Sequence, residues 1–293
     1  MSAFVAAPGE ADHGHRLGRG ASLAWPGTLL GIFFAVPFLL MVLVSLSSGP
    51  GATILSGGLT LDAFSRALGP DYLRVVAYSF GFSTLIGTLS TLVAFPFTWL
   101  IVGMRHRAQT AWLFFLLTTL SLSEVLIVFA WQIMLSRRVG LSNILVRFGI
   151  LHRPENWTPS LAGLVACMVY LVLPFSILTL YPGLSRFDPE LSEAARTLGA
   201  SPRRTMITVT IPNLLRPIAS AFALGTILSL GSYVSPLVLG RPAQWTASVL
   251  IGNVALSEGN FHAASAMALV LLGGTLFVLI AAMLGLRRLE RRR

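Results

Sequence analysis

Long apolar stretches alternate with short polar ones along most of the chain. Six of them are long enough to cross a bilayer as a helix, which takes about 20 apolar residues. They run over 24–46, 75–102, 111–135, 160–181, 218–239 and 263–286. Inside lipid such a stretch satisfies its backbone hydrogen bonds as a helix. The pattern predicts an all-α, polytopic transmembrane helical bundle of about six spans.

The composition supports a membrane protein and argues against a nucleic-acid-binding protein. Only 11% of the 293 residues are charged, whereas a soluble domain carries about 25%. The net charge of +10 would suit a nucleic-acid partner, but the basic residues form short clusters between apolar runs rather than one basic surface. Clusters of this kind orient spans in a membrane. We therefore expect contact with membrane lipid and no binding to nucleic acid.

The arginines also predict the orientation of the chain. Six spans place both termini on one side, and with the termini inside, fourteen of the 21 basic residues are cytoplasmic. This divides the chain into a cytoplasmic tail over 1–22, a transmembrane domain over 23–286 and a basic cytoplasmic tail over 287–293. The loop from Arg137 to Arg153 departs from the positive-inside rule, because this orientation places its arginines on the outer side. There the pattern predicts a short amphipathic helix over 142–148 at the outer interface.

Catalytic and metal-binding patterns do not appear in the sequence. Cys167, the one cysteine, lies inside an apolar run, so it forms no disulfide within the chain. We find no Cys/His metal spacing, phosphate-cradling glycine loop or nucleophile elbow. The sequence predicts no catalytic residues, no metal and no cofactor.

One polar segment, residues 184–213 between the fourth and fifth spans, has its own helix signals. Asp188 is a good N-cap, and Pro189 suits the first helical position. Gly199 can end this helix in the left-handed conformation, and a second helix restarts at Pro202 and ends near Pro212. One face of the first helix collects Leu191, Ala194, Ala195 and Leu198. A helix this short needs a partner, either the chain's own spans or another protein.

The segment resembles the EAA loop of binding-protein-dependent ABC importer permeases, on Glu193-Ala194-Ala195, Gly199 and Ile211-Pro212. The resemblance implies a type I ABC importer permease fold in a bacterial inner membrane, with this loop as the coupling helix that docks onto an ATP-binding subunit. It implies an ionic contact from Glu193, close approach at the two alanines and a turn at Gly199. The ATPase-coupling residues are then Glu193, Ala194, Ala195, Leu198, Gly199, Arg203 and Pro212.

The same resemblance implies a set of partners. Two ATP-binding cassette subunits would hydrolyse ATP, a second permease subunit, like or unlike this one, would complete the path, and an extracytoplasmic solute-binding protein would deliver solute. Residues 130–132, 140–143, 173–175 and 231–236 are most similar to the spermidine/putrescine-type branch, which favours a polyamine-like solute. Related branches carry phosphonates or ferric iron, and these stay open.

Four residues are candidates for the translocation path: Glu124, Trp131, Tyr170 and Tyr233. A carboxylate within a span costs roughly 2.5–3.5 kcal/mol, so Glu124 should face the bundle interior, hydrogen-bonded by Thr119, Ser121 or Ser123. It is either a partner for a cationic solute or a satisfied structural residue. The aromatic rings offer cation–π surfaces, although rings near span ends more often belong to the interfacial belt.

Two other function classes fit the sequence less well. A secondary transporter driven by an ion gradient would show internal repeats and several midplane ion ligands, and we find neither. A membrane-embedded enzyme would need paired acid–base residues or a metal cluster near a span end, and the chain lacks one.

Overall fold

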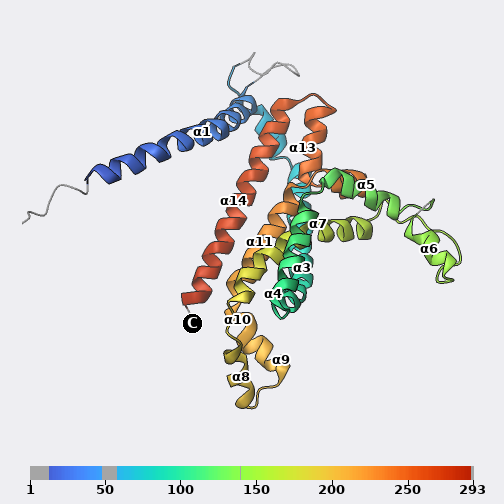
Figure 1. Cartoon of the computed structure of the whole chain (residues 1–293). Helices are drawn as coiled ribbons and strands as arrows, with labels where there is room; N and C mark the ends of the chain where they lie inside the picture. Colours follow the sequence, from blue (N-terminus) through green and yellow to red (C-terminus); the bar gives the residue numbers. More distant parts are fainter. Residues whose placement is uncertain (1–12, 48–57, 139, 292–293) are drawn as a thin grey trace, which may run out of the picture.

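The computed structural model describes residues 13–47, 58–138 and 140–291, and within them the chain is built from helices, with one isolated bridge between Ser47 and Leu59. Figure 1 shows their arrangement. The α-helices are α1 (His13–Leu46), α2 (Asp62–Ala67), α3 (Pro70–Val102), α4 (His106–Leu120), α5 (Glu124–Met134), α6 (Leu141–Arg147), α7 (Leu161–Ser185), α8 (Pro189–Thr197), α9 (Pro202–Thr205), α10 (Ile211–Asn213), α11 (Leu215–Gly231), α12 (Val234–Leu239), α13 (Ala247–Leu256) and α14 (Phe261–Arg291). A π-helical turn (Met206–Thr210) and a 3-10 turn (Pro242–Gln244) complete them.

The predicted all-α polytopic fold is confirmed. Four helical segments are long and apolar enough to cross a membrane: Pro26–Leu46, Pro70–Val102, Leu161–Ser185 and Phe261–Ala281. Two bent pairs bring the number to six if each pair counts as one span. The amphipathic helix predicted over 142–148 is present as α6. Two short helices, α2 and α13, were missed, because α2 is polar and α13 is too short to span.

The third span was predicted as one helix over 111–135, and this was wrong. The chain breaks after α4, and α5 turns through 91°. At the break, the Ser121 hydroxyl bonds back to the Leu117 carbonyl, while Ser123 takes an extended conformation that starts α5. Short polar side chains compete with helical backbone bonding, so two serines this close together favour a break.

The fifth span, predicted over 218–239, also differs. Helix α11 ends at Gly231, Ser232 is extended, and α12 begins at Val234. At its other end, α11 meets the segment Pro202–Asn213 at a bend of 72°. The apolar run therefore contains a helix, a break and a second short helix, which composition alone does not reveal.

The centre of the molecule is a three-helix packing of α3, α7 and α11. Glycines bring α3 and α11 together: a Cβ added at Gly87 would lie 2.9 Å from the Phe222 carbonyl oxygen and 3.0 Å from the Thr226 nitrogen. A Cβ on Gly225 would lie 3.3 Å from the Gly87 Cα. Small residues allow such close approach between membrane helices, where dispersion contacts replace the hydrophobic effect.

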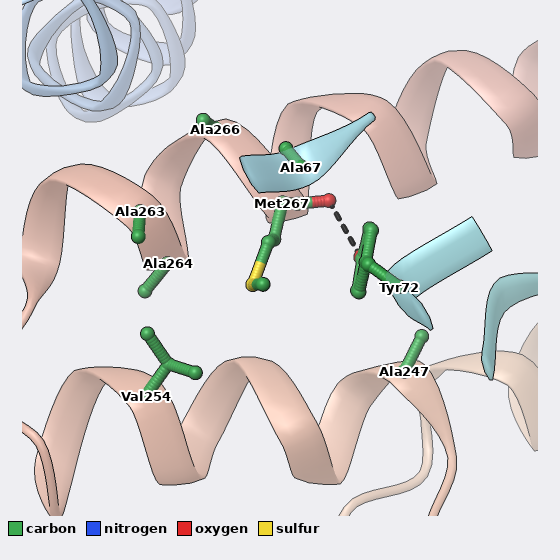
Figure 2. Packing of buried hydrophobic residues seen from close by; sticks show 8 residues of the cluster. All are labelled: Ala67, Tyr72, Ala247, Val254, Ala263, Ala264, Ala266 and Met267. Atoms are coloured by element: carbon green, nitrogen blue, oxygen red, sulfur yellow. Dashed lines mark hydrogen bonds between the residues drawn. The ribbon is translucent and has the colours of Figure 1, made fainter. Parts of the chain in front are cut away.

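A second packing unit lies at one end of the molecule, where α2, α3, α13 and α14 meet (Figure 2). Alanines on α14 face Val254 of α13, and the Tyr72 hydroxyl donates to the Met267 carbonyl at 2.8 Å. The buried phenol is therefore paired, which removes the cost of burying its hydroxyl. This contact fixes the start of α3 against α14.

Among the α1 residues whose side chains the structure describes, 26–46, the buried ones are Val44 and Ser45, near the end of the helix (Figure 1). It is already helical from His13, so the part of the expected 1–22 tail that the structure describes continues the first span. Likewise, α14 continues to Arg291, through most of the expected 287–293 tail. Residues 1–12 and 292–293 lie outside the described ones.

Candidate functional site

The first half of the 184–213 loop folds as its local signals predict. Helix α8 begins after Asp188, whose Oδ1 accepts a hydrogen bond from the Glu190 backbone N–H at 2.9 Å. Pro189 occupies the first turn, where its missing N–H costs nothing. Gly199 has φ +85°, and the Ala200 N–H donates to the Ala195 carbonyl at 3.1 Å. The loop is thus a capped helix followed by a tight turn.

The second half returns toward the bundle. Ser201 caps α9 through a 3.4 Å bond from the Arg204 N–H to its Oγ, and the chain then forms the π-helical turn and α10, which contains Pro212. The hydroxyls of Ser192 on α8 and Thr210 on the π-helical turn lie 3.4 Å apart. This contact joins the two halves of the loop. Turns of the π type occur often at functional sites.

The apolar face of α8 is not covered by the part of the chain that the structure describes. No residue of α8 is buried, and Leu198 is 89% exposed. Leu191, Glu193 and Ala194 are exposed as well, while Ala195 is half-buried. Figure 1 places α8 and α9 at the end of the molecule remote from α13. The sequence left open whether α8 packs on the chain's own spans or on another protein. The described spans do not pack on its apolar face.

Both ends of the loop are fixed in the membrane bundle. Leu184 is 3% exposed and Leu214 is 2% exposed, and both lie in one buried cluster with residues of α3, α4, α7 and α11. Phe187 stacks at a tilt on Trp99 of α3, with ring centroids 6.1 Å apart. A force on the loop would therefore pass directly to the central helices.

The second group of candidates centres on Glu124, at the start of α5. Its Oε1 accepts hydrogen bonds from the hydroxyls of Ser232 at 2.9 Å and Ser235 at 3.0 Å. The expected donors were wrong, because Thr119 and Ser121 donate to carbonyls of their own helix. One carboxylate thus joins two helix breaks, the one before α5 and the one between α11 and α12.

A cavity of about 240 Å³ opens beside this carboxylate. Its lining comes from α4, α5, α7 and α11 and includes Glu124, Tyr170 and Ser232. Trp131 packs on Tyr170, with ring centroids 5.8 Å apart. Tyr233 does not join this group, because its ring lies against Gly252 of α13. Three of the four path candidates are therefore brought together.

The cavity carries negative but no positive charge. None of the arginines in the described part of the chain lies among its lining residues. Apart from the two serines, no described residue forms a hydrogen bond or ion pair with Glu124. A carboxylate oxygen in a cavity that an aromatic ring, Tyr170, also lines suits a cation. Ser232 and Ser235 were not singled out from the sequence, since only the fold brings them within reach of a residue more than 100 positions away.

Comparison with known proteins agrees with this architecture. Residues 28–292 match the family described as binding-protein-dependent transport system inner membrane component. The spermidine/putrescine transport system permease protein PotB of Escherichia coli K12 is 30% identical over 257 residues, covering 84% of this chain and 90% of that protein. PotB of Haemophilus influenzae is 27% identical over 229 residues, covering 78% of each.

Solved structures resemble the chain as well. A bacterial alginate ABC transporter, in complex with an alginate pentasaccharide-bound periplasmic protein, contains a chain that aligns with a TM-score of 0.74. The alignment covers 94% of this chain and 96% of that one, at 16% sequence identity. At this identity the likeness concerns the fold.

Proposed function

Because the chain belongs to the family of binding-protein-dependent transport system inner membrane components, we propose that it is the permease subunit of an ABC importer whose 184–213 loop docks onto an ATP-binding subunit. The observation that carries the docking step is the exposed face of α8, capped at both ends and ending in Leu198. A short helix is marginal in water without a packing partner. A groove on the ATP-binding subunit would provide that partner.

The attachment of the loop supports a role as a lever. Its ends, Leu184 and Leu214, are buried among the central helices, and the Ser192–Thr210 contact holds its two halves together. Docked on an ATPase that closes and opens, the loop would move the cytoplasmic ends of α7 and α11. Glu193 would form an ionic contact, and Ala194 and Ala195 would allow close approach. ATP hydrolysis belongs to the partner, and this chain transmits its motion.

The remaining parts of the assembly follow from the family. A second permease subunit would complete the path, two ATP-binding subunits would lie on the cytoplasmic side, and a solute-binding protein would deliver solute outside. Both termini would be cytoplasmic, with the membrane-spanning part over 23–286 and short tails over 1–22 and 287–293. The outer side is then the end that carries α6 and α13.

The solute that we propose is a polyamine-like cation. The PotB relatives, which are named as spermidine/putrescine permeases, support this class. The cavity supports it independently, because Glu124 and Tyr170 line it with a carboxylate and an aromatic ring, which stabilise an ammonium group. Trp131 packs on Tyr170 behind it. Tyr233 would act elsewhere, by fixing α13 through its contact with Gly252.

Docking is tested by purifying the tagged chain from its native membranes and measuring how much ATP-binding subunit comes with it. Leu198→Asp and Glu193→Arg should each reduce the recovered ATPase several-fold. Matched changes at the other end of the molecule, Leu256→Asp and Glu258→Arg, alter residues that are also exposed and should leave the recovered ATPase unchanged. Full ATPase recovery with both loop variants would overturn the proposal.

A further inference from the structure

The segment between α5 and α7 takes part in neither site described above. We call residues 136–138 and 140–153 the outer arm. The outer arm contains Arg137, Arg138, Arg147 and Arg153 and no acidic residue, and all four arginines are exposed. Arginine on the outer side works against the positive-inside rule, so orientation of the chain does not account for this cluster.

The outer arm also exposes an apolar face. Leu141, Ile144 and Phe148 follow one another at helical spacing along α6, so they share one side of it. All three are exposed, Phe148 by 76%, and Ile150 beyond the helix by 68%. On another side, Ser142 is fully buried. The described chain therefore leaves the apolar side of the arm uncovered.

The arm projects sideways from the central helices (Figure 1). Helix α5 runs across the bundle, at 91° to α4, and carries α6 sideways (Figure 1). Where the arm begins, the Trp157 backbone N–H donates to the Leu135 carbonyl at 3.0 Å. Tryptophan is enriched at membrane interfaces, where its ring is apolar and its N–H meets polar groups. The Trp157 Nε1–H donates to the Glu155 carboxylate, and a ring with a polar partner of this kind is typical of the membrane–water interface.

We propose that the outer arm lies on the outer leaflet and binds the headgroups of anionic phospholipids. Leu141, Ile144 and Phe148 enter the boundary between headgroups and acyl chains, and the four arginines contact lipid phosphates. A short helix with an apolar face and flanking basic residues is the arrangement that binds an anionic membrane surface. Each arginine near such a surface is worth about a fivefold preference for it. The proposal depends on neither the solute nor the partner of the 184–213 loop.

The arm is tested with the full chain in lipid vesicles. Phe148→Cys is labelled with an environment-sensitive fluorophore, and quenching by lipids that carry a spin label near the headgroup is measured. Cys167 is buried, so the unsubstituted chain gives the labelling background. Glu258→Cys, in another outer loop, is the matched exposed control. Vesicles contain phosphatidylcholine alone or with phosphatidylglycerol.

We expect the label at 148 to be quenched several-fold more than the label at 258, and more strongly when phosphatidylglycerol is present. Replacing the four arginines with glutamine should remove the phosphatidylglycerol increment, in a chain that still elutes as a single species. Equal quenching at 148 and 258 would overturn the proposal. The proposal would also be overturned if the label at 148 changed its environment only after a solute-binding protein or second permease was added, since the arm would then be a protein interface.

Discussion

The contact between α3 and α11 at Gly87 allows a quantitative test of the packing. Alanine at this position would place its Cβ 2.9 Å from the Phe222 carbonyl oxygen and 3.0 Å from the Thr226 nitrogen. Both are backbone atoms, so no side-chain rotation relieves the overlap, and the two helices must separate. Overpacking of this kind costs about 1–3 kcal/mol. Gly81, on the same helix, has nothing within 4 Å of an added Cβ.

The matched variants are therefore Gly87→Ala and Gly81→Ala. Alanine favours a helix over glycine by about 0.8–1.0 kcal/mol in both, so this contribution cancels in the comparison. The remaining difference of about 1–3 kcal/mol corresponds to a lower midpoint for Gly87→Ala by roughly 2–12 °C, at about 2–4 °C per kcal/mol. Thermal unfolding of the detergent-solubilised chain measures it. Equal midpoints would show that α3 and α11 are not in contact at Gly87.

Three further predictions concern the sites. Gly199→Ala forces a left-handed conformation on a residue with a side chain, at about 1–2 kcal/mol, and should lower ATPase recovery, whereas Gly103→Ala, at a glycine with φ −74°, should not. Asp188→Ala removes the cap of α8, at about 0.5–2 kcal/mol, and should lower ATPase recovery more than Asp188→Asn does; equal recovery would contradict the capping role. Glu124→Gln keeps an acceptor for Ser232 and Ser235 but removes the charge. In a polyamine uptake assay it should therefore be as deficient as Glu124→Ala. Wild-type uptake by Glu124→Gln would show that Glu124 has a structural role only.

The 184–213 loop could be predicted closely because its signals are local. A cap such as Asp188 acts on an N–H two residues away, and Gly199 supplies a conformation that depends on no distant contact. The sequence did not predict the exposure of α8, because a small apolar face serves equally for packing inside the chain and for docking outside it. In the sequence, Leu184 and Leu214 do not differ from other apolar residues, and the structure shows that both are buried in one cluster.

An all-helical membrane protein with about six spans could be predicted from the sequence, because the run of apolar residues and the length of a helix are both local properties. The sequence also located the capped loop and the family resemblance. The 91° turn in the third span and the hydrogen bonds from Ser232 and Ser235 to Glu124 became visible in the folded chain. A helix break and a hydrogen bond across more than 100 residues both depend on which neighbours the bundle brings close. A local pattern of apolar and polar residues does not contain that information.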